Sequence, residues 1–186
     1  IISGQGELHI NLILDKIKTR FGVGIKKSKP KIPYRETITS NSQAKYRHKK
    51  QSGGAGQFAE VWLRIEAGDR GSGVDFQQSL VGQNVDRGFV PSVEKGINAI
   101  CEDGIIAGCN VVDLKIDFYD GKMHPVDSND MAFQIAGKNA FIDAFKQAAP
   151  KILEPIYKLK IKIPEDVMGD IMGDVSQRRG KVSGMG

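Results

Sequence analysis

The residues best suited to recognition chemistry lie together in one short stretch of the sequence, QSGGAGQF at 51–58. Its three glycines carry no Cβ atom, so their backbone N–H groups can approach a phosphate or a base closely. The segment before it adds Tyr46, a ring able to stack on a base, and side chains suited to phosphates: Lys45, Arg47, His48, Lys49 and Lys50. The pattern predicts nucleic-acid contact, although a glycine-rich hairpin turn has the same signature.

Motifs for catalysis are not found in the sequence. It has no GxxxxGK[ST], no GxGxxG after a strand, no HExxH, no GxSxG and no paired cysteines at zinc spacing. His9, His48 and His124 stand in three separate segments, which disfavours a metal triad. Asp170 and Asp174 lie four residues apart, a spacing more typical of solvent-facing helix charges. We therefore expect a binding module with no catalytic residue, no metal site and no cofactor of its own.

Composition and charge point to a globular protein with a polyanionic partner. Of the 186 residues, 40% are hydrophobic, and no apolar run approaches the roughly 18 residues of a membrane span. The net charge is +5, and residues 1–52 hold twelve Lys or Arg against three Asp or Glu. Cys101 and Cys109 lack CxxC spacing, as expected for reduced, buried thiols in the cytoplasm. The sequence begins inside a structural pattern without an initiator Met, so we expect a fragment of a longer protein.

The elements that would position these residues follow from hydrophobic periodicity. Helices are predicted at 7–21, ended by Gly22, at about 91–103, and from a cap at Ser128 or Asn129 until Pro150. Small and aromatic residues along the third helix would let it lie close to a sheet. Alternation or turn residues predict strands at 31–40, 43–50, 59–65, 74–81 and 111–119.

The last part of the sequence predicts the start of another unit. IYKLKIKI at 156–163 alternates lysines with apolar residues and predicts a strand, and Pro164 begins a helix that ends near Gly180. A further strand is expected from 181, and Met168 and Met172 are expected in the core. Only the middle of the chain looks complete, and its mixture of strands and helices predicts a two-layer α+β (α/β) fold.

Six blocks of sequence, taken in order, resemble one protein family. They are GQGELHINLILDKIKTRFGV, KPKIPYRETI, HKKQSGGAGQF, VDSNDMAFQIAGKNAF, LEPIYKLKI and MGDIMGDVSQRRGKVSGM. In this order they closely resemble the C-terminal half of bacterial elongation factor G, a ribosome-dependent translational GTPase. The resemblance covers essentially the whole chain, and six ordered blocks are far more specific than any one of them.

The resemblance implies a division into three domains. Residues 1–31 resemble the end of the factor's domain III, 32–152 its domain IV and 153–186 the start of its domain V. Domains III and V of the family are ferredoxin-like plaits, so both would be partial here. Domain IV shares its fold with a ribosomal small-subunit protein and contains a left-handed βαβ crossover, against the usual right-handed preference.

The resemblance also implies a function and the residues that perform it. Domain IV of the family enters the ribosomal A site during tRNA–mRNA translocation, and its tip loops contact decoding-centre RNA. The matching tip residues are Gln51, Ser52, Gly53, Gly54, Gly56 and Gln57 in the first loop, and His124, Val126, Asp127 and Ser128 in the second. Asp127 could instead serve only as a helix cap. Large-subunit RNA would meet domain V, GTP and Mg²⁺ would bind a GTPase domain outside this fragment, and a monomer without membrane contact is expected.

Two positions depart from the family pattern. Ala55 stands where the family usually has Arg, and Pro125 where it usually has Asp. These departures favour, as an alternative, a paralogue specialised for ribosome recycling or for action without GTP hydrolysis. A ribosomal protection protein fits less well, because those proteins depart from the QSGGxGQ and HxVDS patterns. A sugar- or nucleotide-kinase-like enzyme is disfavoured by the missing phosphate loop.

Overall fold

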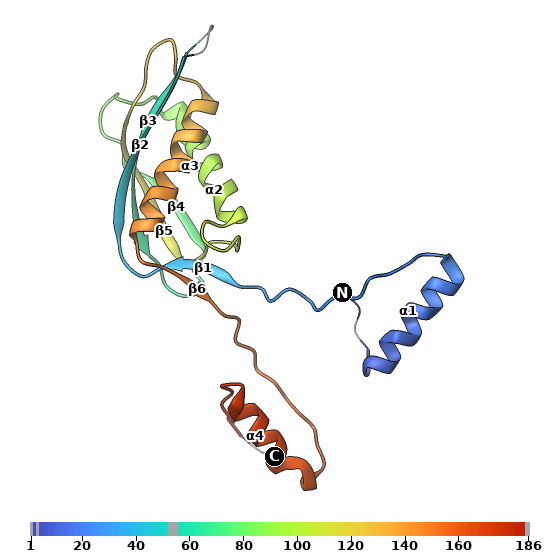
Figure 1. Ribbon diagram of the computed structural model, residues 1–186. Helices are drawn as coiled ribbons and strands as arrows, with labels where there is room; N and C mark the ends of the chain where they lie inside the picture. The colour runs from blue at the N-terminus through green and yellow to red at the C-terminus, as the bar shows by residue number, and fades with distance from the viewer. Residues whose placement is uncertain (1, 3, 52–55, 185–186) are drawn as a thin grey trace. The chain divides into compact units, whose positions relative to one another are not determined.

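The computed structural model describes residues 2, 4–51 and 56–184 and divides into two compact units, Ile1–Pro155 and Ile156–Gly186. Figure 1 shows the path of the chain. The helices of the first unit are α1 (Glu7–Phe21), the short 3₁₀ turn η1 (Arg87–Phe89), α2 (Val90–Asp103) and α3 (Asp130–Gln147). Its strands are β1 (Arg35–Ile38), β2 (Ser42–Lys50), β3 (Gln57–Ala67), β4 (Val74–Gln78), β5 (Leu114–Lys122) and β6 (Pro150–Leu153).

The strands form two sheets. Four of them pair in the order β2-β3-β5-β4, antiparallel except for the parallel pair of β4 and β5, which is connected through α2. The other two, β1 and β6, form a separate antiparallel ladder in which Arg35 lies opposite Leu153. Figure 1 shows α2 and α3 side by side on one face of the four-stranded sheet, with α3 covering β2 and β3. The α+β class predicted from the sequence is confirmed.

The core lies between α3, α2 and the inner face of the sheet. Alternate residues of β3 and β5 are buried there, as their sequence pattern predicted, and α3 contributes three fully buried phenylalanines: Phe133, Phe141 and Phe145. The two helices approach each other closely because Gly96 and Gly137 face the partner helix. A Cβ atom on Gly96 would lie 2.3 Å from the backbone oxygen of Gln134.

The helix boundaries follow from local capping, as the sequence predicted. α1 ends at Gly22, whose φ of 67° and N–H bond to the Lys18 oxygen terminate the helix. α2 has a proline in its first turn. α3 is capped by Asn129, whose side chain accepts a hydrogen bond from the Ala132 N–H at 2.9 Å. The cap is therefore Asn129, and the alternative role of Asp127 as a cap is wrong.

Several strand predictions need correction. The strand expected at 31–40 is confined to β1, because prolines at 30 and 33 cannot donate to a ladder. The strand expected at 111–119 begins instead at Leu114, because Asp113 has a φ of 62° that interrupts the extended chain. Pro150 was expected only to stop a helix. It also opens β6, where a proline is tolerated as the first residue.

The second unit contains the largest error. The segment 156–163 is not a strand: it pairs with no other segment in the part of the chain that is described, and Ile156 and Leu159 are 94% and 79% exposed. Alternation favours a strand only where a neighbour supplies hydrogen bonds and buries one face. The predicted helix is confirmed as η2 (Glu165–Val167) followed by α4 (Met168–Gln177). Met168 and Met172, expected in the core, are each 38% exposed, and 181–184 form no strand.

The cysteine prediction is correct for one thiol and only partly for the other. Both are free, with Cys101 buried and Cys109 partly exposed. Burial, together with the nearby charge of Glu102, raises the pKa of the Cys101 thiol to about 12. Cys101 is therefore a core residue that stays protonated at neutral pH.

Candidate nucleic-acid interface

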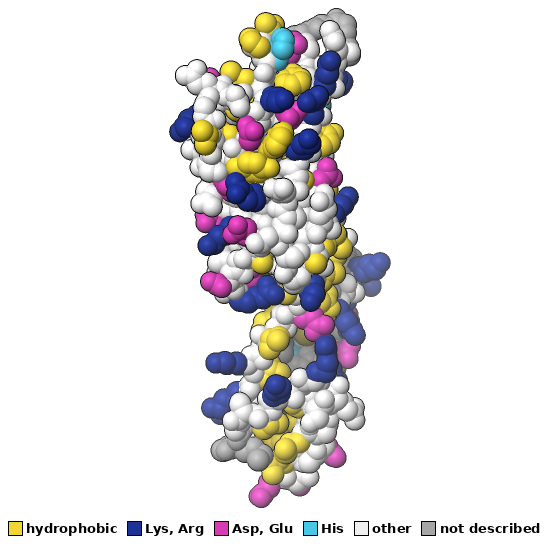
Figure 2. Space-filling model, turned by 90° about the vertical axis from the view of Figure 1, so that its left-hand side faces the viewer, with side chains coloured by type: hydrophobic (Ala, Val, Ile, Leu, Met, Phe, Trp, Pro, Cys, Tyr) yellow, Lys and Arg dark blue, Asp and Glu magenta, His cyan; other side chains and the backbone are white. Residues whose placement is uncertain are grey.

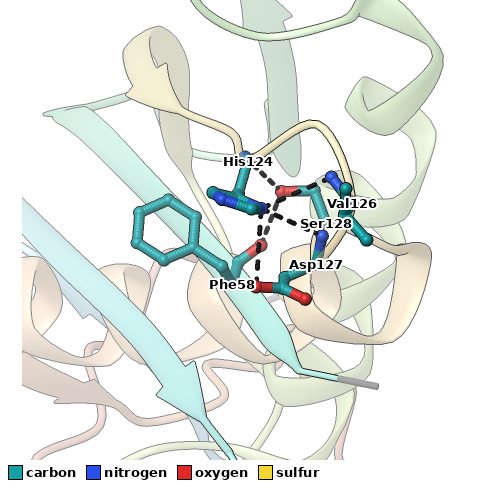
Figure 3. A network of polar contacts seen from close by, with 5 residues as sticks. All are labelled: Phe58, His124, Val126, Asp127 and Ser128. Carbon is teal, nitrogen blue, oxygen red and sulfur yellow. Dashed lines mark hydrogen bonds and ion pairs between the residues drawn. The ribbon is translucent and has the colours of Figure 1, made fainter.

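We call one end of the four-stranded sheet the tip. It contains the second loop, residues 123–129 between β5 and α3, and the described ends of the first loop, Gln51 after β2 and Gly56 before β3. The second loop is bonded to β3 at Phe58. Its N–H donates to the Asp127 backbone oxygen at 2.8 Å, and its own backbone oxygen accepts from the Ser128 hydroxyl at 2.7 Å. Figure 3 shows this network from close by. The second loop is therefore bonded to the start of β3, two residues after the first loop.

Ser128 connects the second loop to the start of β3. Its hydroxyl accepts a hydrogen bond from the His124 backbone N–H at 2.8 Å while it donates to Phe58. Its single proton is thus committed inside the protein, because a hydroxyl has one donor and two acceptor positions. The geometry assigns Ser128 the task of fixing where His124 stands.

His124 is held by its Nδ1 atom. The backbone N–H groups of Asp127 and Val126 point at this nitrogen from 3.2 and 3.4 Å, so in the neutral ring Nδ1 accepts and Nε2 carries the proton. The side chain is 51% exposed, and its ring packs edge-on against Phe58, with centroids 6.3 Å apart. This leaves Nε2–H as a donor that no hydrogen bond within the described residues uses.

Asp127 lies beside both loops. Its carboxylate is 3.4 Å from the His124 Nδ1 atom, a contact that becomes an ion pair only if the ring is protonated. The same carboxylate presses against the first loop, because a Cβ atom on Gly56 would lie 2.8 Å from it. A side chain at 56 would therefore displace the Asp127 carboxylate from this position.

The basic segment on β2 is split between the two faces of the sheet. Lys45, Arg47 and Lys49 point to the face not covered by helices, whereas Tyr46 packs against the core and is unavailable for stacking on a base. His48 shares the inner face and lies 2.9 Å from the Gln57 side-chain oxygen, a polar contact between two residues predicted to bind RNA. Lys50, the last residue of β2, is exposed.

The structure describes the predicted first loop at its two ends, Gln51 and Gly56. Ser52, Gly53 and Gly54, and with them the family departure Ala55, lie outside the described residues. Gln51 is exposed at the end of β2. In the second loop, Pro125 and Val126 are exposed, and Val126 is 82% accessible.

A third loop at the tip was missed by sequence reasoning. Residues 79–86 follow β4, and the Asn84 backbone oxygen accepts a hydrogen bond from the Met123 N–H at 3.3 Å. Their position follows from topology, because β4 and β5 are parallel and their carboxyl ends lie at the same edge of the sheet. The sequence contains only a weak signal for this loop. It is the turn-type cluster GQN at 82–84, which directly follows the strand expected at 74–81.

Other kinds of site can be considered only for the described residues. Within them no three His, Cys, Asp or Glu side chains lie close enough together to hold a metal ion. No helix in the same residues has the length and apolarity needed to cross a membrane. What the tip offers is an exposed imidazole donor, backbone polar groups and lysines, which are groups that recognise polar or anionic surfaces.

Fold and tip together define a class: a two-layer α+β protein that presents polar loops at one end of its sheet. Comparison with known families makes this specific. The model for elongation factor G, domain IV, matches residues 30–149, and the model for the elongation factor G C-terminus matches residues 151–186. The chain belongs to the elongation factor G family, as the six sequence blocks indicated.

Individual relatives agree. The chain is 47% identical over 182 residues to elongation factor G 2 of Trichodesmium erythraeum (strain IMS101). The aligned region covers 98% of this chain and 26% of that protein. A crystal structure from Thermus thermophilus matches it with a TM-score of 0.86 at 39% identity, covering 98% of this chain and 27% of that one. The chain thus spans about a quarter of the length of these relatives.

Proposed function

We propose that this chain is the ribosome-contacting part of a factor that promotes tRNA–mRNA translocation. In this proposal the tip enters the A site of the small subunit and contacts decoding-centre RNA and the codon–anticodon duplex. GTP hydrolysis with Mg²⁺ would belong to another part of the factor, and the place of action would be the cytoplasm. Family membership supports the proposal.

The observation that carries the proposal is the exposed donor of His124. Its Nδ1 atom is occupied by the loop backbone, so the ring is oriented and its Nε2–H points to a possible partner. A-form RNA displays 2′-hydroxyl groups in a wide, shallow minor groove, where a fixed donor can bind without reading sequence. A factor that must act on every codon requires this kind of recognition.

The basic end of β2 supports the same partner. Lys49 and Lys50 are exposed directly before the first tip loop, where they can neutralise phosphates flanking the minor groove. Phosphate contacts of this kind add affinity without sequence preference. Together with His124 they give the tip one hydrogen-bond donor for the groove and two cations for its edges.

The proposed partner is tested by reversing the charges of Lys49 and Lys50 to Glu in the full-length factor and measuring ribosome association over a salt titration. Each lost phosphate contact lowers the slope of log affinity against log salt by about one. The matched control is Lys146→Glu with Lys151→Glu, which changes the net charge equally at exposed positions far along the chain from the tip. Equal slopes for the tip variant and the unmodified factor would contradict the proposal.

A second candidate function is suggested by Pro125. Its fixed φ and missing N–H change the tip loop beside His124, as would suit a paralogue devoted to ribosome recycling. That candidate predicts that the full-length factor splits ribosomes into subunits but does not move tRNA. If Pro125→Asp restored tRNA movement, the proline would be identified as the reason why the factor does not move tRNA.

A further inference from the structure

The sheet face not covered by helices carries two aromatic rings in contact, each with a cation over it. The ammonium group of Lys45 lies 5.0 Å from the centroid of the Trp62 ring, and the guanidinium of Arg64 lies 4.6 Å from that of Tyr119. The two rings meet edge to face, with centroids 6.1 Å apart. We call these four residues, from β2, β3 and β5, the aromatic–cation cluster. Figure 2 shows this side, with Lys and Arg side chains around a group of hydrophobic ones in its upper half.

The acidic groups near the cluster are already engaged. Glu60 is buried and pairs with Arg47, while it also accepts a hydrogen bond from the Trp62 indole N–H at 2.8 Å. Burial alone would raise the pKa of Glu60, but the hydrogen bonds from Trp62 and Arg47 and the nearby charges lower it overall. Asp117 pairs with Arg64 at 3.3 Å and accepts from the Ser79 hydroxyl. By contrast, no hydrogen bond or ion pair within the described residues uses the ammonium group of Lys45.

We propose that the aromatic–cation cluster binds the phosphate backbone of double-helical RNA. This inference rests on the proposed function and extends it from the tip to the open face of the sheet. The rings act as supports: they are half-buried and hold the two cations above the sheet at fixed positions. A cation held in this way loses less side-chain entropy when it meets a phosphate.

The geometry favours phosphates over stacked bases. Lys45 lies over Trp62 and Arg64 lies over Tyr119, and the two rings meet edge to face, so one face of each ring is already occupied by a cation. Binding through cations alone carries no sequence preference but depends strongly on salt. The surface therefore suits a regular duplex better than a single strand with exposed bases.

The arrangement is also continuous with the tip. Alternate residues of β2 point to the open face, so Lys45, Arg47 and Lys49 form a line that runs towards the first tip loop. Along a strand these positions are about 6.8 Å apart, which allows the three cations to contact successive phosphates of one RNA strand. No acidic residue lies on β2, and the acidic residue opposite it, Glu60, is buried and paired with Arg47.

Protection of the sheet edge does not explain the cluster. β2 is an edge strand, and lysines on edge strands commonly prevent pairing with other chains. That would account for Lys45, but Arg64 and Tyr119 lie on the inner strands β3 and β5, where no edge needs protection. Edge protection therefore does not explain why Arg64 is held over the Tyr119 ring.

The test is a titration of the whole 186-residue chain with a fluorescently labelled RNA hairpin that has a long duplex stem. The double variant Lys45→Gln with Arg64→Gln should bind about tenfold or more weakly near 0.1 M salt, with a salt slope smaller by about two. Lys115→Gln is the matched control, because Lys115 shares this face but lies opposite Glu66 and Asp75. It should leave the slope unchanged. Circular dichroism confirms that each variant is folded.

The ring-support idea has its own readout. Trp62→Leu removes the support and should weaken duplex binding about threefold while leaving the salt slope unaltered, whereas Trp62→Phe keeps a ring and should bind nearly normally. Trp62 is the only tryptophan in the chain, so its fluorescence also reports on the cluster directly. Its emission should change with the same midpoint as duplex binding.

Three outcomes would overturn the inference. The first is unchanged duplex affinity in Lys45→Gln with Arg64→Gln. The second is tighter binding of a single strand with strong quenching of Trp62, which would indicate base stacking. The third is competition by an acidic polypeptide as effective as competition by duplex RNA, which would indicate a protein partner. Because Lys49 and Lys50 are untouched here, failure of this test leaves the separate test of the tip intact.

Discussion

The two ends of the central α+β unit use polar residues in opposite ways. At the end opposite the tip, which we call the root, two acidic side chains are buried and accept hydrogen bonds from the protein's own backbone. At the tip, polar groups are exposed, and only some of their donors and acceptors are used internally. Burying a charge is costly unless it is fully hydrogen-bonded, so the buried carboxylates of the root need donors from within the protein. The exposed polar groups of the tip are free to bind other molecules.

Glu36 is the centre of the root. It is completely buried in β1, and its carboxylate accepts hydrogen bonds from four backbone N–H groups in the loop after α2, at 2.7 to 3.1 Å: Ile105, Ile106, Ala107 and Cys109. Asp113, also buried, accepts from the N–H groups of Gly71 and Gly73. These two acids hold two irregular segments in place, 105–109 and 71–73, and leave little for an outside partner.

The contrast at the tip lies between Ser128 and His124. Ser128 is used as the root acids are used, because both its donor and an acceptor position serve the fold. His124 is anchored on one ring nitrogen and offers the other outward. The difference teaches that a residue predicted to bind RNA can instead serve to position its neighbour.

The largest effect is expected from Glu36→Gln. The amide keeps one acceptor but turns an NH₂ group towards backbone N–H donors, so we expect a loss of about 3 kcal/mol in the free energy of unfolding. Urea denaturation followed by circular dichroism measures it. Glu102→Gln, at an exposed position near the end of α2, is the control and should change stability by less than about 0.5 kcal/mol. If the two substitutions lowered the free energy of unfolding equally, the buried root acid would not differ from a surface acid, which would contradict this account.

The same carboxylate should make stability depend on pH. Burial tends to raise the pKa of Glu36, but the four backbone hydrogen bonds outweigh it, so the folded pKa lies below the ordinary value. The stabilising contribution is then fully present above the unfolded pKa of about 4.3 and is lost as pH falls through the folded pKa. Urea midpoints measured from about pH 7 to about pH 3 should fall in acid. The fall should be shallower in Glu36→Gln, and parallel curves would contradict this assignment.

A smaller effect is expected from Ser128→Ala. Two hydrogen bonds are lost, one within the second loop and one to Phe58 of β3, which should cost about 1 kcal/mol and loosen the second loop. Amide hydrogen exchange should speed up at His124 and Asp127 but not at the root. Ser42→Ala, which removes a hydroxyl bond to the Ala144 backbone oxygen, serves as the control and should leave tip exchange unchanged. Faster exchange throughout the chain would mean that Ser128 supports the whole fold.

The smallest change in stability is expected from His124→Ala. The ring is about half exposed, and its contacts are weak hydrogen bonds to a surface loop, so unfolding should shift by less than about 0.5 kcal/mol. The same urea denaturation measures it. A loss as large as that of Ser128→Ala would place His124 among the structural residues and remove the distinction between them.

The sequence predicted what is determined locally. The ends of α1 and α3 follow from Gly22 and Asn129, and the alternation of β3 predicted its buried face. Features set by distant neighbours were not predictable. The segment 156–163 alternates like a strand but has no partner among the described residues, and nothing local to Glu36 indicates that it is buried.

The candidate site divides in the same way. Family resemblance brought the two tip loops together, and the Phe58 bonds hold the second loop to the start of β3, two residues after the first loop. The third loop at Asn84 and the separation of Lys45 from His48 onto opposite faces required the sheet order and register. The aromatic–cation cluster was hidden for the same reason, since its members come from three strands that only the fold brings side by side.

The central claim is that the tip acts on the ribosome while the root maintains the fold. The most direct test is His124→Ala in the full-length factor, with tRNA movement and ribosome-stimulated GTP hydrolysis measured on the same preparation. We predict slower tRNA movement with hydrolysis and stability near normal. Normal tRNA movement, or a selective loss of hydrolysis, would contradict the claim.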